Sequence, residues 1–241
     1  RLVSEGHLPA GIVASNPEWL RPLIGVKPAS GHFLHFVGFE IGRGSDGKWW
    51  VLGDRTQAPS GAGYALENRV ASVRAFPGFY SGSHVERLVG FFRGFRDGLN
   101  AMRREEGSRA GILTPGPMNE TYFEHAYIAR YLGMMLLEGD DLVVNDGKLM
   151  VRTVSGPKPI SVLWRRMDAA WSDPLELAAD SRLGTPGMLG AIRSQGVTMI
   201  NALGSGILES RAFLAFMPRL SEVLHGKPLS VSNIATWWCG G

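Results

Sequence analysis

The sequence contains one cysteine, Cys239, in 241 residues. A lone cysteine excludes a disulfide within the chain and is typical of proteins that work in a reducing compartment. No run reaches the ~18 apolar residues that a membrane-spanning helix needs. The first residues, from Arg1 to Glu5, lack the apolar stretch of a secretory signal. We therefore expect a cytoplasmic protein with no membrane partner.

Several motifs of common enzyme classes are also missing. No glycine-rich loop is followed by lysine in the Walker A pattern, and no histidine or cysteine pair has zinc-ligand spacing. The Gly-x-Ser-x-Gly motif of serine hydrolases is absent as well. The formal net charge is only +3, and no basic run is interleaved with aromatic residues. Nucleic acid is therefore not an expected partner.

Short apolar segments alternate with helical patterns in the second half of the chain. Strands are predicted over 110–114, 134–137, 142–144, 149–153, 160–164 and 197–201, and helices over 120–132, 185–195 and 209–224. Asn145-Asp146-Gly147 predicts a hairpin turn. This alternation predicts an α/β fold, with a mainly parallel sheet and flanking helices. Charges and glycine near 105–110 predict a boundary between lobes 1–107 and 108–241.

The first half of the chain predicts a β-hairpin followed by helices. Strands over 33–41 and 49–52 flank the turn signal 44–47, and helical patterns cover 66–75 and 84–104. This arrangement places Asp54 at the end of a strand, where ligand sites of α/β proteins gather.

Residues 54–69 combine acidic, amide and arginine side chains with Ser60, Gly61 and Gly63. Glycine allows a backbone to approach a ligand closely, Ser60 and loop amides can donate hydrogen bonds, and arginine binds anions in a bidentate fork. The same residues fit a strand, a turn and a helix start with arginines in solvent. The residue types alone leave both interpretations open.

Three further turns contain polar residues that are candidates for ligand binding. Asn119 and Glu120 lie where a strand meets a helix, and Asn119 would serve as an N-cap or mark a helix end that binds an anion. Arg166 shares a strand face with Asp168, so the two form either an ion pair or a substrate clamp, while Arg165 faces the other side. Asn201 opens a glycine-containing turn that suits a phosphate or carboxylate. His125, alone on its helix, is better explained as a packed residue than as a metal ligand.

These segments resemble, in the same order, motifs of the circularly permuted ATP-grasp proteins (type 2). Those proteins are relatives of glutathionylspermidine synthase and other carboxylate–amine ligases. The resemblance is carried by residues 54–69, 113–126, 162–168 with 172–175, 201–206 and 234–240. It implies a partial circularly permuted ATP-grasp fold, with the 54–69 signature in lobe 1–107 and a Rossmann-like pre-ATP-grasp lobe over 108–241. It also implies an ATP-dependent ligase that joins a small-molecule or peptide carboxylate to an amine, with ATP and Mg as cofactors.

The resemblance and the chemistry together assign roles to individual residues. The catalytic group is Asp54, Arg55, Glu67 and Arg69, of which Asp54 and Glu67 would also contact the metal. The ATP-binding group is Ser60, Gly61, Gly63 and Asn68. The substrate-binding group is Asn119, Glu120, Arg165, Arg166, Asp168 and Asn201.

One departure from the family pattern affects the expected metal site. Active relatives carry Glu-x-Asn at the strand end, whereas this chain has Gly53 and Arg55 around Asp54. We expect Arg55 to bind a phosphate or a substrate carboxylate directly. The alternative is a non-catalytic binding or scaffolding module that kept the fold and lost its metal ligands.

The two ends of the sequence predict a piece of a longer protein. The chain begins without methionine at Arg1 and stops just after the apolar residues 237–239. In the family that the chain resembles, the lysines and glycine-rich loop that cover the ATP phosphates follow this point. We therefore expect this piece alone to be inactive toward ATP.

Overall fold

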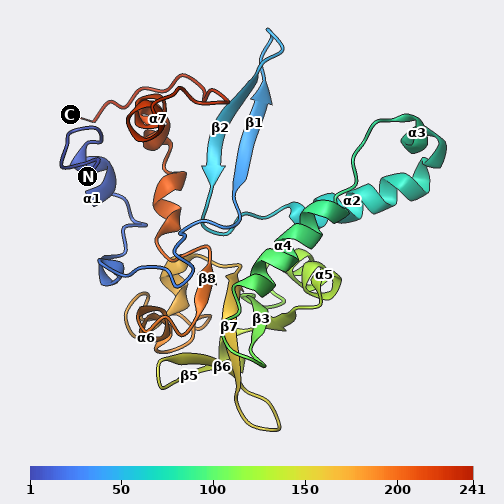
Figure 1. The fold of residues 1–241 in the computed structure, drawn as a ribbon, viewed down its shortest axis with the longest axis vertical. Coiled ribbons are helices and arrows are strands. Elements are labelled where there is room, and N and C mark those ends of the chain that lie inside the picture. The colour runs from blue at the N-terminus through green and yellow to red at the C-terminus, as the bar shows by residue number, and fades with distance from the viewer. Residues whose placement is uncertain (241) are drawn as a thin grey trace.

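The computed structural model describes residues 1–240. A mixed sheet flanked by helices forms the body of the molecule, and a separate hairpin and a helical arm project from it (Figure 1). The strands of the main sheet are β3 Arg109–Leu113, β4 Met135–Leu137, β5 Leu142–Asn145, β6 Lys148–Val151, β7 Lys158–Arg165 and β8 Thr198–Ile200.

Four strands of the main sheet run parallel, and two are antiparallel additions. β3 pairs in parallel with β4 and β7, and β8 pairs in parallel with β7. The hairpin β5–β6 joins the start of β7 in antiparallel fashion. Asp146 and Gly147 both have positive φ, 48° and 72°, as a type I′ turn requires. The α/β prediction is confirmed, but the sheet is mixed rather than mainly parallel because this hairpin adds two antiparallel strands.

Helices connect and cover the strands. The α-helices are α1 Ala10–Ala14, α2 Ala62–Ala75, α3 Pro77–Gly82, α4 Val89–Ala101, α5 Tyr122–Leu132, α6 Met188–Arg193 and α7 Met217–His225. The 3-10 helices are Arg21–Leu23, Gly139–Asp141, Ala169–Ser172, Ser205–Glu209 and Arg211–Ala215. α5 ends at Gly133, whose φ of 67° is the left-handed conformation expected of a C-cap glycine.

The prediction of one helix over 209–224 was wrong. Two 3-10 helices, Ser205–Glu209 and Arg211–Ala215, precede the shorter α7. Ser210 is extended, with φ −64° and ψ 121°, and it separates the two 3-10 turns. Pro218 lies in the first turn of α7, where proline lacks only an N–H that would be unpaired in any case.

The two faces of the sheet bury two hydrophobic clusters. Leu113 and Leu163 pack in one cluster, whereas their neighbours Ile112 and Val162 pack in the other. Adjacent residues point to opposite faces of a strand, so β3 and β7 are covered on both sides. The second cluster also contains Phe36, Leu66, Phe92 and Leu99 from the first half of the chain. The division into lobes 1–107 and 108–241 stays a prediction.

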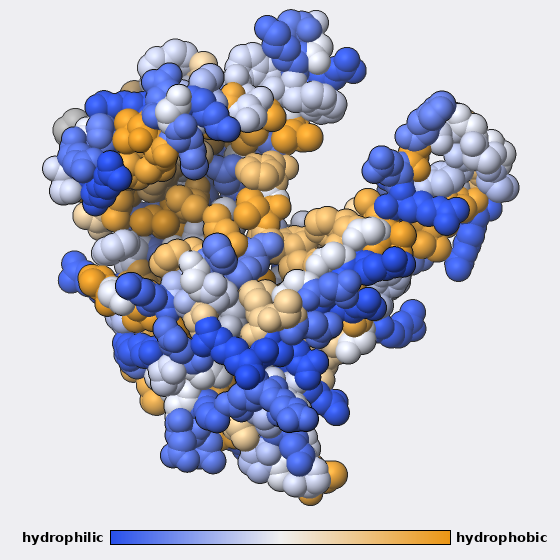
Figure 2. All heavy atoms as spheres, in the orientation of Figure 1, coloured by the Kyte–Doolittle hydropathy of each residue, from blue (hydrophilic) through white to orange (hydrophobic). Residues whose placement is uncertain are grey.

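The predicted first hairpin is present as β1 Gly38–Arg43 and β2 Trp49–Arg55, paired antiparallel. β2 continues through Asp54, which therefore lies within the strand. The segment near the carboxyl terminus runs beside β2, because Val51 N–H donates to the Ser232 carbonyl at 2.9 Å. The space-filling view shows the tip of the hairpin and the α2–α3 arm projecting from the rest of the molecule (Figure 2). Within residues 1–240, no helix has the length and apolar character needed to cross a membrane.

Candidate functional site

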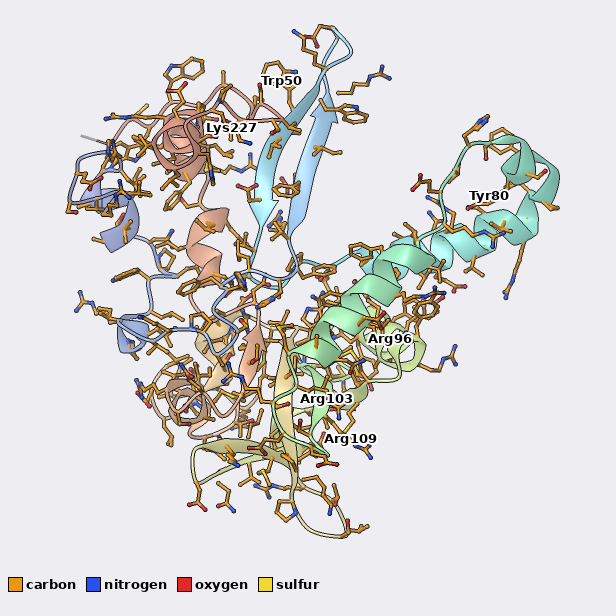
Figure 3. The ribbon with its side chains drawn as sticks, viewed as in Figure 1. Trp50, Tyr80, Arg96, Arg103, Arg109 and Lys227 are labelled. Atoms are coloured by element: carbon orange, nitrogen blue, oxygen red, sulfur yellow. The ribbon has the colours of Figure 1, made fainter. Side chains whose placement is uncertain are left out.

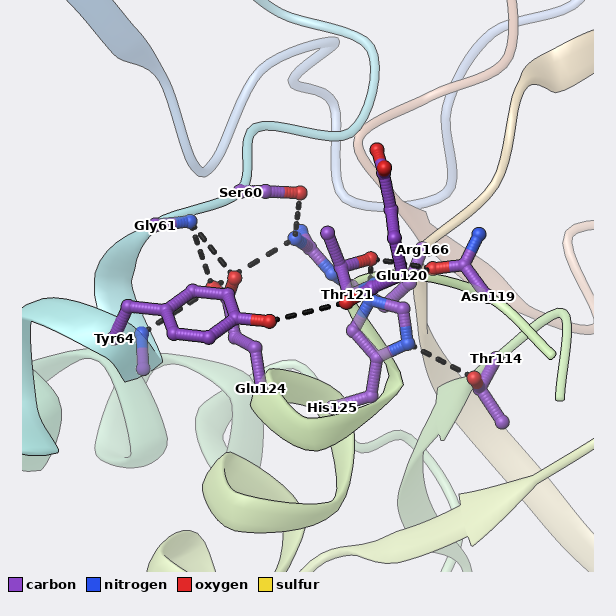
Figure 4. A network of polar contacts seen from close by, with 11 residues as sticks. Ser60, Gly61, Tyr64, Thr114, Asn119, Glu120, Thr121, Glu124, His125 and Arg166 are labelled. Carbon is purple, nitrogen blue, oxygen red and sulfur yellow. Dashed lines mark hydrogen bonds and ion pairs between the residues drawn. The ribbon is translucent and has the colours of Figure 1, made fainter. Parts of the chain in front are cut away.

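The candidate site lies where the parallel strands β3 and β7 end. Thr114 follows β3 and Arg166 follows β7, and Arg166 N–H donates to the Leu113 carbonyl at 2.8 Å. The loop before α2 lies against these strand ends and brings Ser60 and Gly61 next to Arg166 (Figure 4). Ligands of α/β proteins bind at the carboxyl ends of parallel strands, so this position suits a binding site.

Glu124 of α5 is buried beneath the loop and accepts hydrogen bonds from it. Gly61 N–H lies 2.8 Å and 3.0 Å from the two carboxylate oxygens, and Gly63 N–H lies 3.2 Å from Oε1. Gly61 has φ 116°, which favours glycine. A Cβ on Gly63 would lie 2.7 Å from Glu124 Cγ. These glycines are thus explained by the close approach of an internal carboxylate at the amino end of α2, where negative charge is stabilised.

Arg166 is buried beside this carboxylate, but its hydrogen-bonding capacity is mostly unused. Its Nη2 donates to Ser60 Oγ at 3.1 Å and lies 3.9 Å from Glu124 Oε1, beyond hydrogen-bond distance. Its guanidinium lies over the Trp164 ring at 4.9 Å. Within residues 1–240, Arg166 Nε and Nη1 are buried without a hydrogen-bond partner. Unpaired buried donors are costly, so they mark a place where an anionic group would be stabilised.

Burial lowers the pKa of Arg166 to about 10, and the nearby Glu124 carboxylate opposes this shift. Arg166 therefore stays charged at neutral pH. The resulting positive charge faces Ser60, an exposed residue of the loop. A buried cation thus lies directly behind an exposed serine.

His125 fixes the loop that connects β3 to α5. Its Nδ1 lies 2.9 Å from Thr114 Oγ1, and its Nε2 lies 3.1 Å from Thr121 Oγ1. Burial, and next the charge of Arg166, lower the pKa of His125 to about 4. The imidazole is therefore neutral near pH 7. These contacts agree with its interpretation as a packed residue.

Asn119 and Glu120 lie around Arg166 in the same view (Figure 4). Asn119 is not the N-cap of α5, because the helix begins at Tyr122 and Thr121 occupies the cap position. Asn119 Oδ1 instead accepts from Thr121 N at 3.0 Å and from Thr121 Oγ1 at 2.6 Å, which closes the turn before the helix. The Glu120 carbonyl accepts from the Tyr64 hydroxyl at 3.1 Å, and this contact ties the turn to α2.

A second polar group lies on the other side of β7. Arg165 is fully buried and donates to the Gln57 carbonyl at 3.1 Å and to the Met167 carbonyl. Burial lowers its pKa to about 10, whereas Asp168 and Glu18 raise it. Asp168 is the N-cap of the short helix Ala169–Ser172. Arg165 and Arg166 thus lie in different surroundings. Asp168 lies near Arg165, so the ion pair considered between Asp168 and Arg166 is not formed within residues 1–240.

Two acidic residues near Arg165 were not singled out from the sequence. Glu209 Oε1 accepts from Thr56 N and Gln57 N, each at 2.6 Å. The pKa of Glu18 is raised by burial and by the neighbouring carboxylates Asp168 and Glu209. Glu18, Gln57 and Glu209 line a hollow of about 390 Å³ beside the loop.

Asn201 is held entirely by backbone groups. Its Oδ1 accepts from His35 N at 2.8 Å and Phe36 N at 3.0 Å. Its Nδ2 donates to the Phe36 carbonyl at 2.7 Å and the Thr56 carbonyl at 2.6 Å. Asn201 thus fastens both ends of the first hairpin to the end of β8, and its role toward substrate stays a prediction.

The structure does not bring Asp54 and Glu67 together. Asp54 is half-buried on β2, and its pKa is raised by burial and then by Glu209. Glu67 on α2 lies by Tyr127 of α5, whose hydroxyl pKa is raised by burial and by Glu67. In the part of the chain that the structure describes, no three His, Cys, Asp or Glu side chains gather to hold a metal ion. The metal assignment stays a prediction.

The remaining predicted residues lie around the edges. Arg55 points along the hairpin and pairs with Glu40 of β1, with Nε 2.9 Å from Glu40 Oε1. Arg69 Nη1 donates to the Glu86 carbonyl at 2.6 Å, in the helical arm. Asn68 is exposed on α2. None of these contacts joins them to the group around Arg166.

The structure therefore brings together one part of the predicted site. These residues are Ser60, Gly61, Gly63, Asn119, Glu120 and Arg166. Sequence reasoning missed Glu124, which holds the loop from about sixty positions away. The only signal was the pair of glycines, which indicates a close approach without naming the partner.

The sequence matches one protein family and several proteins of bacteria. The profile described as "Circularly permuted ATP-grasp type 2" matches residues 1–241. An uncharacterized protein of Synechocystis is 34% identical in an alignment 241 residues long, which covers 99% of this chain and 50% of that protein. Two uncharacterized proteins of Mycobacterium tuberculosis are 37% and 33% identical, with 99% of this chain and 27% and 44% of theirs covered. The chain spans about half the length of these relatives or less.

Proposed function

Because the chain belongs to the circularly permuted ATP-grasp type 2 family, we propose that it is part of an ATP-dependent ligase. The ligase would join the carboxylate of a small molecule or peptide to an amine. This activity would belong to a protein as long as these relatives, of whose length the chain spans about half or less. The observation that supports the proposal is the buried guanidinium of Arg166 behind Ser60, whose Nε and Nη1 have no hydrogen-bond partner within residues 1–240.

The chemistry of such a ligase places negative charge on the reacting groups. When bound, ATP supplies the phosphoryl group that activates the carboxylate. Arg166 Nε and Nη1 have no partner within residues 1–240, and Glu124 is too far away to hydrogen-bond them. We assign Arg166 and Ser60 to the binding of a carboxylate or phosphoryl oxygen. Donors held in a buried site need little reorganisation and interact more strongly than donors in water.

The other residues of the group would hold the donors in place. Glu124 ties Gly61 and Gly63 to α5, and His125 ties the turn after β3 to the same helix. The Gly61 and Gly63 N–H groups already donate hydrogen bonds to Glu124. The group that this loop would offer to a ligand is therefore the Ser60 hydroxyl. Asn119 and Glu120 lie beside the buried Arg166 (Figure 4).

Magnesium enters this proposal through the family alone. The carboxylates assigned to it, Asp54 and Glu67, lie in different surroundings, and residues 1–240 contain no cluster that fits a metal ion. No step within this chain is therefore assigned to a metal.

The assignment of Arg166 and Ser60 is tested with the protein extended to the length of its relatives. ADP release would be measured with ATP, hydroxylamine as the amine, and a panel of small carboxylates and short peptides. We expect at least one carboxylate to stimulate ADP release, and Ser60→Ala and Arg166→Lys to reduce that stimulation about tenfold or more. Arg152→Lys, at an exposed position after β6, is the matched control. Full stimulation in both site variants would contradict the assignment.

A non-catalytic binding module is the second candidate, and one contact favours it. Arg55, at the strand position before the loop, is tied to the Glu40 carboxylate of the neighbouring strand. A residue fixed in this way is less able to take part in phosphoryl transfer. The module would not bind Mg-ATP in a saturable, metal-dependent manner, whereas the ligase would.

A further inference from the structure

A second pocket lies at the opposite end of β3 from the candidate site. It has a volume of about 420 Å³ and is enclosed by the end of α4, the start of β3 and the turn between α5 and β4. Arg96 and Arg103 come from α4 and the residues just after it, and Arg109 is the first residue of β3 (Figure 3). Arginines from α4, from the residues after it and from the start of β3 thus line one hollow.

This pocket is distinct from the group around Arg166. β3 has five residues, from Arg109 to Leu113, and Thr114 follows it. At ~3.3 Å per residue, the pocket lies roughly 15 Å along the strand from Thr114. No residue of the candidate site lines it.

The charge in the pocket is of one sign. No carboxylate belongs to its lining. Within residues 1–240, Arg96 forms an ion pair only with Asp97, at 3.2 Å between two well-exposed side chains, and such surface pairs contribute little. Within residues 1–240, neither Arg103 nor Arg109 forms an ion pair. The nearby Glu105 instead pairs with Lys148 at 2.5 Å. A concave surface with one sign of charge concentrates the field on an oppositely charged ligand.

Two helices end at this pocket. α4 ends at Ala101, and α5 ends at Leu132 with Gly133 as its cap. The unpaired carbonyls at such ends favour nearby cations. Each guanidinium has five N–H donors in a planar fork, so a contact with a helix end leaves donors for a ligand.

We propose that this pocket binds a small molecule carrying two or more phosphate or carboxylate groups. The arginines would hold the anionic groups in bidentate hydrogen bonds. Leu99, Leu132 and Met134 line the remaining wall and suit an apolar part of the same molecule. The volume and the enclosure by three segments favour a small ligand over an extended polymer.

The proposal is tested by calorimetric titration of the 241-residue chain with tripolyphosphate and, separately, with citrate. We expect saturable binding with one ligand per chain, weakened about tenfold or more in Arg103→Glu and in Arg109→Glu. Arg152→Glu and Arg182→Glu change the net charge equally at exposed positions elsewhere and should bind like the parent. Binding to Ser60→Ala is measured as well, to distinguish this pocket from the candidate site.

The pattern across the variants decides the outcome. Tighter binding of tripolyphosphate indicates a phosphate ligand and tighter binding of citrate a polycarboxylate, and both support the proposal. Equal losses in the Arg152 and Arg182 variants would overturn it, because the effect would then come from net charge. Unchanged binding in the Arg103 and Arg109 variants, or loss only in Ser60→Ala, would also overturn it. None of these outcomes depends on ligase activity.

Discussion

Glu124 holds the loop before α2 in place and lies beside Arg166 at the candidate site. Its carboxylate accepts hydrogen bonds from the Gly61 and Gly63 amides, and within residues 1–240 it is the carboxylate that lies near Arg166. Removing it with Glu124→Ala leaves a buried guanidinium without its counter-charge and two amides without acceptors. We expect a loss of about 3–5 kcal/mol in the free energy of unfolding, measured by chemical denaturation. Glu120→Ala, at an exposed position of the preceding turn, is the control. Equal stability of Glu124→Ala and the parent would show that the carboxylate is not coupled to Arg166.

Gly63 tests the close packing of α2 on α5. A Cβ there would lie 2.7 Å from Glu124 Cγ and 3.1 Å from Ile128 Cγ1. We expect Gly63→Ala to lower the free energy of unfolding by about 1–3 kcal/mol through overpacking. Gly94→Ala on α4 meets nothing within 4 Å and should be neutral or stabilising, because alanine favours helix. A stable Gly63→Ala variant would mean that the two helices are further apart than described.

His125 gives the fold a dependence on pH. Its pKa is about 4 in the folded chain, whereas an unfolded histidine has a pKa of about 6.5. Between these values the unfolded chain binds more protons, so stability falls as the pH drops. We expect His125 to account for a loss of about 2 kcal/mol between pH 7 and pH 5. Denaturation curves of His125→Gln should show a flatter pH dependence, with His225→Gln as the exposed control. The same slope in His125→Gln and the parent would remove His125 as its source.

For single residues, the sequence indicates which side chains belong to the candidate site, but it does not indicate which residues they contact. The glycines at 61 and 63 indicate a close approach of the backbone to another group, and that approach is present. The group is Glu124, which lies on a different helix and has no local sequence signal. Asn119 was expected to cap α5 and instead closes the preceding turn, because Thr121 takes the cap position.

Individual elements were predictable where their signals are local. The hairpin at Asn145-Asp146-Gly147 and the end of α5 at Gly133 depend on residues that accept positive φ. The helix expected over 209–224 failed because apolar spacing alone does not show that Ser210 is extended. The predicted helix 84–104 is shorter, Val89–Ala101, since its periodicity extends beyond the turns that are helical.

Asn201 links elements that are far apart in the chain. It hydrogen-bonds the backbone of His35, Phe36 and Thr56 from the end of β8. We expect Asn201→Ala to lower the free energy of unfolding by about 2–4 kcal/mol, because buried backbone groups lose their partners. Asn68→Ala, exposed on α2, should change stability little. Asn201→Asp should fail to restore stability, since a carboxylate cannot donate to the two carbonyls. Restoration by aspartate would contradict this account.

At the scale of the whole molecule, the α/β class follows from the alternation of strand and helix patterns. The family follows from the order of the motifs, and the matched profile covers residues 1–241. The arrangement of charged side chains does not follow from that order. Asp54 and Glu67 are 13 positions apart in sequence, yet one lies on β2 and the other on α2. Local spacing cannot show this separation, because the loop between them turns toward the sheet and is fixed by Glu124 and Glu209.

The most direct test of the ligase proposal is calorimetric titration of Mg-ATP into the protein extended to the length of its relatives. The proposal predicts saturable binding that is lost when magnesium is omitted and EDTA is present. Heats that are absent, or that do not depend on magnesium, would contradict it and favour the non-catalytic module.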